Sequence, residues 1–429
     1  MSFVFLIIFV VSYFLHLTAR FPILGAIRFD VIIGFTALIL AYCQSCKDML
    51  RYNEITARRL SHFLLYIVIS LPLVTWPGSV IRYNLEYWSK VAFLFLLFVA
   101  IVRTEKRLQL AMSVFIACQI FRAVEPLYLH LTEGYWGDMA YSAVEGSLVG
   151  LHRLSGAPSD VVNPNQLAWV IVTDIPFLFY LCWLGRKWWE KVFFLMAVPP
   201  LIESLLLTGS RSGLISLATT IMGMILLSKK KGRNLIVVIF LVLPFAMLIL
   251  GGLSRDLQTR YLSIWENNVA GADTREGRIN ALFKQLDTVS HNPLFGNGLG
   301  TSAESNVHLL GSNPQPTHDL YIEIIQETGV VGFILFTLFI VSLVKSLIAA
   351  KKMLSEEGDD GNSWLFRLIM ALQVWVFMDL FYALSCFGLS SWEWYFFGGV
   401  TTVSVVLVKE RLNLRGKSET LMPLLTSKK

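Results

Sequence analysis

The stretch ETGVVGFILFTLFIVSLVKSL, residues 327–347, decides the fold, because it is long and apolar enough to cross a lipid bilayer as a helix. A helix rises about 1.5 Å per residue, so roughly 20 such residues cross a hydrocarbon core about 30 Å thick. Similar hydrophobic runs recur along the whole chain, at 2–19, 29–46, 60–77, 88–102, 108–128, 164–184, 191–208, 212–228, 234–252, 327–347, 364–387 and 394–408. The pattern predicts an all-α fold, a polytopic transmembrane helix bundle of about 12 spans.

The composition supports a single integral membrane domain over residues 1–429. Hydrophobic residues make up 55% of the 429 residues and charged residues only 15%, with a mean hydropathy of +0.61. Soluble domains carry about 25% charged residues. The isoelectric point near 9.0 could suggest nucleic acid, but the basic residues fall in short clusters between hydrophobic runs, as in cytoplasmic loops of membrane proteins. Nucleic acid is therefore not expected as a partner. Residues 1–19 show no signal-peptide cleavage site and are expected to form the first helix.

The basic clusters alternate from one connecting loop to the next, so all of them fall on one side when twelve spans are drawn. They are Lys47/Arg51/Arg58/Arg59, Arg103/Lys106/Arg107, Arg186/Lys187/Lys191, Lys229/Lys230/Lys231/Arg233, Lys345/Lys351/Lys352 and the tail 409–429. By the positive-inside rule that side is the cytoplasm. We therefore expect both termini in the cytoplasm, and two exterior loops: a first one at 132–163 and a large one at 253–318, before the tenth span.

Two arginines on the exterior side run against the positive-inside rule. Arg153 lies in HRLSGAP, and Arg211 lies in TGSRSG with almost no loop around it. A guanidinium there is costly unless it faces a polar cavity or binds an anion, and a lipid diphosphate at headgroup depth would match its donor geometry. Alternatively, Arg211 reaches the membrane interface along its own stem or pairs with Glu203.

A histidine and three acids open the helix that begins THDLYIEIIQETG. His318 is followed by Asp319, and Glu323 and Glu327 come at helical steps of four. Carboxylates at the mouth of a membrane helix are too costly to show to lipid, so we expect this face to line a polar cavity with His318 at its rim. A histidine with an ordinary pKa of about 6.5 could take a proton from an acceptor hydroxyl. Position alone equally allows a histidine that only caps or packs the helix start.

Two further polar segments are candidates for substrate binding. Arg122 and Glu125 lie three residues apart near the exterior end of the fifth run, where they could line the same cavity or pair with each other. The stretch HNPLFGNGLGTSAES, residues 291–305, is suited to placing backbone N–H groups near an anion, and Asn297 is its candidate contact. Glycine-rich loops are also often only loops.

Five segments together resemble the superfamily of O-antigen ligases and polysaccharide polymerases, in matching order. They are RLSGAPSDVVNPNQLA (153–168), TGSRSGL (208–214), GRINALF (277–283), NPLFGNGLG (292–300) and HDLYIEIIQETGVVG (318–332). The resemblance covers roughly residues 60–350. Its most specific parts are the serine–arginine step at Arg211 and the histidine followed eleven residues later by a glycine, here His318 and Gly329.

The resemblance implies a fold of about twelve spans and a metal-independent glycosyltransferase that uses undecaprenyl-diphosphate-linked glycans. Arg211 and Arg278 match the arginines that would hold the donor diphosphate, and His318 matches the histidine that would activate the acceptor hydroxyl. Arg153, Arg122, Glu323, Glu327 and Asn297 are the further candidates for substrate contact. No cofactor and no metal are expected, since the exterior loops contain no Asp-x-Asp or clustered His/Asp/Glu pattern.

The acceptor stays open at this stage. A ligase would use lipid A core, a polymerase another lipid-linked glycan, and a related oligosaccharyltransferase a protein hydroxyl or amide. In each case the site would lie at the periplasmic face of a bacterial inner membrane. A secondary transporter of a small anion or solute is the alternative from another class, because twelve spans with both ends cytoplasmic are common there too.

Overall fold

The chain is largely helical in the computed structural model, which describes residues 1–44, 49–137, 142–144, 147–160, 162–228, 251–252, 254–262, 282–312, 316–359, 361–386 and 388–426. The exception within these ranges is one antiparallel hairpin of β1 (Ser142–Val144) and β2 (Ser147–Leu151), with Ser142 opposite Leu151. The predicted all-α class is therefore confirmed in its coarse form.

The long helices follow the hydrophobic runs. They are α1 (Ser2–Phe14), α4 (Phe29–Gln44), α5 (Ile55–Ser70), α7 (Leu85–Ile101), α8 (Glu105–Glu133), α9 (Pro164–Phe177), α10 (Trp188–Leu207), α11 (Arg211–Leu227), α17 (Leu320–Glu356), α18 (Trp364–Tyr382) and α19 (Glu393–Thr426). The predicted run 234–252 lies almost entirely outside the described residues.

Short elements connect these helices or extend them. They are α2 (Leu17–Arg20), α3 (Pro22–Ala26), α6 (Pro77–Ser79), α14 (Arg255–Leu262) and α16 (Ser302–Leu310), the 3₁₀ turns Met49–Asn53, Leu71–Leu73 and Thr288–His291, and the π-helical segments Val80–Asn84 and Leu178–Trp183. The second π-helical segment continues α9 without a break.

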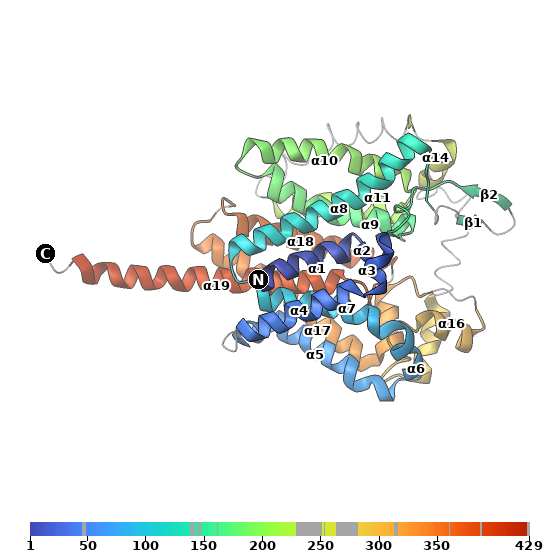
Figure 1. The fold of residues 1–429 in the computed structure, drawn as a ribbon, viewed down its shortest axis with the longest axis horizontal. Coiled ribbons are helices and arrows are strands. Elements are labelled where there is room, and N and C mark those ends of the chain that lie inside the picture. Colours follow the sequence, from blue (N-terminus) through green and yellow to red (C-terminus); the bar gives the residue numbers. More distant parts are fainter. Residues whose placement is uncertain are drawn as a thin grey trace.

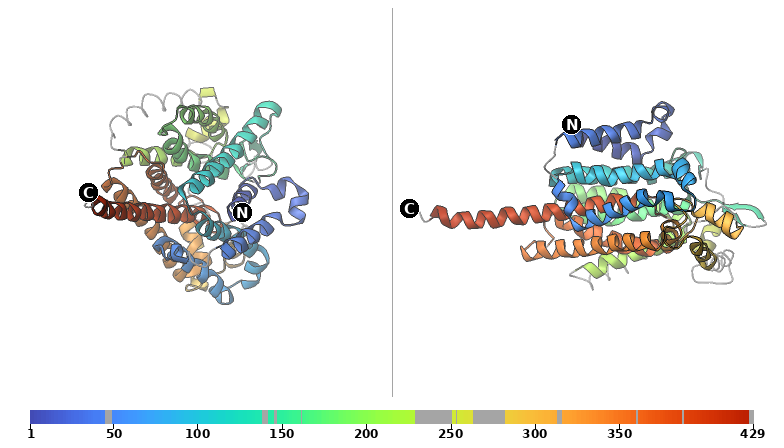
Figure 2. Two further views of the ribbon diagram at one scale, coloured as in Figure 1. Left: turned by 60° about the vertical axis from the view of Figure 1, so that its left-hand side comes forward. Right: turned by 90° about the horizontal axis from the view of Figure 1, so that it is seen from below.

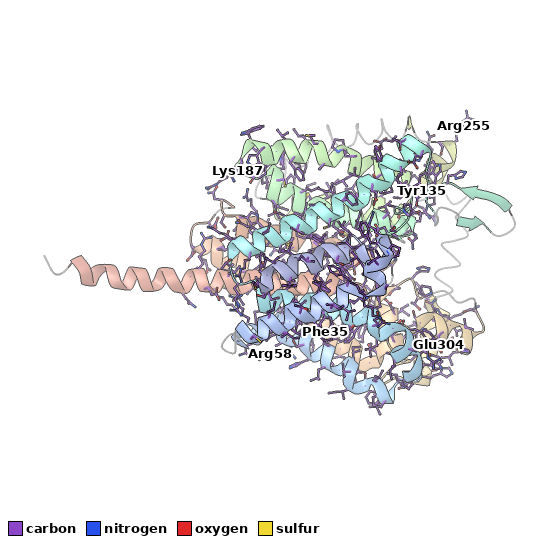
Figure 3. All side chains as sticks on the ribbon, viewed as in Figure 1. Phe35, Arg58, Tyr135, Lys187, Arg255 and Glu304 are labelled. Atoms are coloured by element: carbon purple, nitrogen blue, oxygen red, sulfur yellow. The ribbon has the colours of Figure 1, made fainter. Side chains whose placement is uncertain are left out.

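The long helices run side by side along one direction, and the polar connections gather at one end of the bundle (Figure 1). That end carries the β-hairpin, α6, α14 and α16, while both chain termini lie toward the opposite end (Figures 1 and 2). Figure 3 places Arg58 and Lys187 toward the end of the termini, and Tyr135, Arg255 and Glu304 at the other. This distribution agrees with the predicted alternation of basic and exterior loops, although which end faces the cytoplasm stays a prediction.

Within the described ranges, five helices are long and apolar enough to cross a membrane: Pro77–Ile101, Glu105–Glu133, Pro164–Trp183, Leu320–Glu356 and Trp364–Tyr382. Three shorter helices are also apolar: Ser2–Phe14, Phe29–Ala41 and Arg211–Leu227. Apolar side chains on their outer faces are exposed, for example Phe35 at 48%, as lipid-facing positions would be. The count of about twelve spans remains a prediction.

Two helix boundaries differ from the sequence expectation. His16 adopts a left-handed φ of 50°, so the predicted run 2–19 is divided into α1 and α2. At the other end, α19 continues to Thr426 and projects beyond the bundle, whereas the predicted run ended at residue 408 (Figure 1). The physical reason is that helix formers such as Glu410, Arg411 and Leu412 extend a helix after its apolar stretch has ended.

Helix α17 is interrupted at Gly329, whose φ of 65° and ψ of −174° are not helical. The interruption releases backbone carbonyls that would be costly to leave unpaired. Gln326 and Glu327 accept instead from the N–H groups of Asn297 and Gly298, both at 2.9 Å. The carbonyl of Thr328 accepts from a tyrosine hydroxyl of α5 at 2.6 Å. On the other side of the break, the N–H of Val330 donates to the carbonyl of Pro293 at 2.8 Å, so the loop 292–300 completes the broken helix.

We expect Gly329→Val to destabilise the protein by about 3 kcal/mol or more, because a side chain is strained at this φ and its Cβ would collide with the backbone of Leu294. The measurement is the thermal midpoint and the amount of folded protein in size-exclusion chromatography. Gly78→Ala is the control, since a Cβ there meets nothing within 4 Å. Equal stability of both variants would show that the break does not require glycine.

Candidate active site

His318 lies directly before α17, at the end of the bundle where the connections gather. Its two neighbours are buried and anchored. The Thr317 hydroxyl donates to the side-chain oxygen of Gln326 at 2.6 Å. The Asp319 carboxylate caps α17 by accepting from the N–H of Ile322 at 3.0 Å. His318 itself is exposed, so a fixed backbone presents an accessible imidazole.

The segment TGSRSGL forms the tight turn that places Arg211 at the start of α11. Gly209 adopts a left-handed φ of 58° after α10, and the Ser210 hydroxyl caps α11 by accepting from the N–H of Gly213 at 3.2 Å. A Cβ on Gly213 would lie 2.7 Å from the Cβ of Ala168, so the glycine lets α11 approach α9 closely. Arg211 is the first residue of α11. The positive end of the helix and a guanidinium together favour an anion at this point.

Arg153 supports this turn from the preceding connection. Its side chain is 4% exposed, and its Nε donates to the carbonyl of Thr208 at 2.7 Å. One of its Nη atoms donates to the side-chain oxygen of Asn165 at 2.7 Å. The Ser210 hydroxyl donates to the same oxygen at 3.0 Å. These contacts make Arg153 a residue that holds the turn before Arg211, while substrate contact stays a prediction.

The turn at Arg211 and the start of α17 are joined by a short chain of hydrogen bonds. The carbonyl of Asn165 accepts from the Tyr382 hydroxyl at 3.0 Å, at the end of α18. The next residue of that segment, Ala383, accepts from the N–H of Leu320 at 2.9 Å. Leu320 stands two positions after His318. The structure therefore brings the surroundings of Arg211 and His318 to the same end of the bundle, in one connected assembly.

Arg122 does not pair with Glu125, as one alternative had it. Its guanidinium is buried and binds the carboxylate of Asp160 in two places at 2.9 Å, and it also donates to Gln119 at 3.1 Å. Glu125 instead forms an ion pair with Arg20. The sequence pattern could not reveal this arrangement because both partners are distant along the chain. Arg122 lines a cavity, whereas Glu125 is not among the residues that line it, so the other alternative holds for Arg122 alone.

The expected stripe of acids does not face one polar cavity. Asp319 caps its own helix, while Glu323 and Glu327 are buried and accept backbone N–H groups from segments distant in the sequence. Glu327 accepts from Gly300 at 2.7 Å and Ser302 at 3.2 Å, and Glu323 accepts from Gly388 at 2.7 Å and from the N–H after it. The physical reason is that these loops carry unpaired donors, which a carboxylate satisfies well. The anion that the backbone N–H groups of the glycine-rich loop bind is thus the carboxylate of Glu327, a side chain of the protein itself.

Asn297 is 1% exposed and has a structural place in the same loop. Its side-chain oxygen accepts from the Thr75 hydroxyl at 2.9 Å, and its backbone carbonyl accepts from the N–H of Trp76 at 3.0 Å. These contacts position the loop against the segment before α6. Arg278, the other predicted donor-binding arginine, lies outside the described residues.

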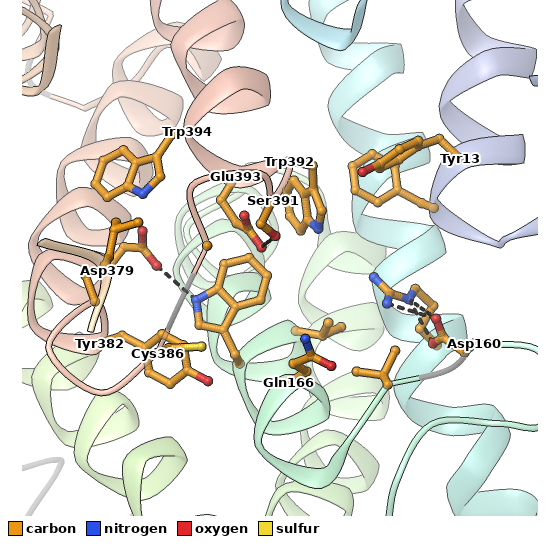
Figure 4. Close-up of a pocket in the computed structure, with 18 of the residues that line it drawn as sticks. Tyr13, Asp160, Gln166, Asp379, Tyr382, Cys386, Ser391, Trp392, Glu393 and Trp394 are labelled. Carbon is orange, nitrogen blue, oxygen red and sulfur yellow. Dashed lines mark hydrogen bonds and ion pairs between the residues drawn. The ribbon is translucent and has the colours of Figure 1, made fainter. Parts of the chain in front are cut away.

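A cavity of about 140 Å³ lies within the assembly that joins His318 to Arg211. Leu320, Tyr382, Gln166 and Arg122 all line it. Figure 4 shows Asp160 on one side of this cavity and Asp379 on the opposite side, with Trp392 between them. Trp169 also lines the cavity. Of the predicted site residues that the structure describes, Arg122 lines this cavity, whose walls are polar and aromatic.

Two buried acids of this cavity were not predicted. Asp379 is 4% exposed and accepts from the indole N–H of Trp169 at 2.9 Å, and Glu393 is 8% exposed and accepts from the Ser391 hydroxyl at 2.6 Å. A signal for Asp379 was present, because it is the acid in the apolar run 364–387, and ionisable residues within a span are functional candidates. Glu393 carried no such signal, because it lies between the predicted runs 364–387 and 394–408.

Together, the apolar helices and the polar end describe a helical membrane protein with a buried site at one end. Residues 192–337 match the family model described as O-antigen ligase, which confirms the predicted resemblance over that stretch. The match includes the segments around Arg211, Arg278, Asn297 and His318. A comparison with curated proteins gave no match.

We expect the Arg122–Asp160 pair to stabilise the protein at neutral pH and to lose this effect in acid. Burial acts to raise the pKa of the Asp160 carboxyl, but Arg122 and the neighbouring His16 outweigh it and hold that pKa below its ordinary value of about 3.9. A lowered pKa in the folded state means that the stabilisation is complete above about pH 5 and disappears as the pH falls through the folded-state pKa.

The measurement is the thermal midpoint of wild type and Asp160→Asn between pH 7 and pH 3. The difference between them should be constant from pH 7 to about pH 5 and should shrink at lower pH. A difference that grew as the pH fell would contradict the assignment.

Proposed function

We propose that this protein is an inner-membrane glycosyltransferase that moves an undecaprenyl-diphosphate-linked glycan onto an acceptor hydroxyl at the periplasmic face. The reaction would serve ligation or polymerisation of a surface polysaccharide such as O-antigen, exopolysaccharide or capsule. The carrying observation is the connected assembly that brings the start of α17, with exposed His318, and the start of α11, with Arg211, to one end of the bundle. The family match over residues 192–337 supports the same class.

In this mechanism His318 takes the proton from the acceptor hydroxyl as its oxygen attacks the anomeric carbon of the donor. The new carbon–oxygen bond forms as the bond from that carbon to the diphosphate oxygen breaks. Undecaprenyl diphosphate leaves with the electron pair, and its charge is stabilised by Arg211 and Arg278. The proton then leaves His318 for solvent or for the diphosphate.

The buried polar groups around the two residues would keep this geometry fixed. Arg153 and Asn165 hold the turn before Arg211, while Thr317 and Asp319 hold the backbone on both sides of His318. Preorganised charge of this kind lowers a barrier without the cost of rearranging during the reaction. Accordingly, the arrangement suits a reaction in which positioning and leaving-group stabilisation do most of the work.

The test is complementation of a host strain that lacks the gene, with wild type, His318→Ala and Arg211→Ala at matched membrane levels. We expect both variants to lose at least 99% of long-chain surface glycan on a gel, since removal of one general base or one charge-stabilising donor commonly costs 10²–10³-fold in rate. Loss of capped lipid A core would indicate a ligase, and single-repeat products would indicate a polymerase.

Matched controls are His308→Ala, an exposed histidine of α16, and Arg58→Ala, an exposed arginine toward the opposite end of the bundle. Both should restore long glycan to the wild-type level. Full restoration by His318→Ala and Arg211→Ala as well would overturn the proposed site and favour a transporter.

A further inference from the structure

The cavity beside α17 contains two buried acids that the proposed transfer step does not use. Asp379 comes from the end of α18 and Glu393 from the start of α19, and both line the cavity. Among the described residues, Asp379 accepts from the Trp169 indole N–H and Glu393 from the Ser391 hydroxyl, and neither acid forms an ion pair. Two acids buried without an ion-pair partner are costly to keep for stability alone.

The remaining polar groups reach the same space from other elements. In Figure 4, Glu393 and Ser391 come from one side of the cavity, and Gln166 from the opposite side. A carboxyl group has several acceptor positions, of which one is used in each acid here, and a glutamine amide adds both donors and an acceptor. These groups are suited to hydroxyl groups, which donate and accept at once.

The walls and the size point to a ring-shaped ligand. The indoles of Trp169 and Trp392 line the cavity with their centroids 5.3 Å apart, and Trp394 lines it as well. Aromatic faces contact the C–H faces of a sugar, whereas a metal ion would need several convergent oxygen ligands instead. A volume of about 140 Å³ is comparable to cavities that hold a six-membered ring.

We propose that this cavity binds one sugar ring of the acceptor glycan, with the carboxyl groups of Asp379 and Glu393 receiving its hydroxyl groups. Leu320, two residues after His318, forms part of the cavity wall, so a sugar held there would direct a neighbouring hydroxyl toward the imidazole. The assignment of the sugar to the acceptor rests on the proposed function. The binding of a saccharide in the cavity does not.

The test uses the full-length protein in lipid nanodiscs and a fluorescent oligosaccharide, prepared by mild acid release from the surface polysaccharide of the host. We expect Glu393→Gln and Asp379→Asn each to weaken binding about tenfold or more, since each removes a hydrogen bond to a carboxylate. Asp174→Asn is the matched control, because this acid is 1% exposed and does not line the cavity. It should bind within twofold of wild type.

A second measurement does not depend on the carboxyl variants folding. Ser391→Cys, in a background without other cysteines, should react with a small thiol reagent at least fivefold more slowly when the oligosaccharide is present. Unchanged binding by both carboxyl variants would overturn the proposal. If those variants do not fold, unchanged reactivity of Ser391→Cys would overturn it.

Transfer to the same oligosaccharide from lipid-linked donor separates the two hypotheses. If wild type binds the oligosaccharide through the cavity but transfers nothing to it or to native acceptors, the proposed function fails and the saccharide site stands. If wild type transfers glycan and both carboxyl variants keep its KM for acceptor within twofold, the cavity proposal fails and the proposed function stands.

Discussion

The interruption of α17 at Gly329 is the constraint on which the polar end of this protein depends. A backbone break within a membrane-sized helix is tolerated only where other protein groups complete its hydrogen bonds. Here the loop 292–302 does so twice, since its N–H groups donate to the released carbonyls and also to the carboxylate of Glu327. The loop can lie this close because Gly296, Gly298 and Gly300 adopt positive φ values. The segment between His318 and Gly329 therefore contains the part of α17 that precedes the break, and these contacts anchor it.

The acids of that half-helix explain how a large exterior connection is fixed to a bundle. Glu327 holds the segment before α16, and Glu323 holds the segment before α19. A buried carboxylate that accepts two backbone N–H groups is a stronger anchor than a contact between neutral groups. Arg122 also anchors a connection, the one before α9, because its guanidinium donates to the carboxylate of Asp160. Most of these charged residues therefore position connections at this end of the bundle.

The sequence predicted the parts of this structure that depend on local pattern. Hydrophobic length predicted the long helices, and the turn residues around Arg211 predicted a tight exterior connection. Contacts between distant segments could not be read in this way. The partner of Arg122 lies 38 residues away, and the donors to Glu323 lie 65 and 66 residues away. An acid at helical spacing in an apolar segment must receive hydrogen bonds. Only the three-dimensional arrangement shows whether a substrate or a loop of the protein donates them.

The cavity lies at the start of the helical segment 320–328, and the helix break lies at its end. On one side, the glycine-rich loop fixes its end through Gly329. On the other, Leu320 lines the cavity and is bound through its N–H to Ala383. A group at the start of such an element cannot move without disturbing both contacts, because a helical turn transmits displacement along its axis. The backbone on the C-terminal side of His318 is thus held by the same packing that shapes the cavity.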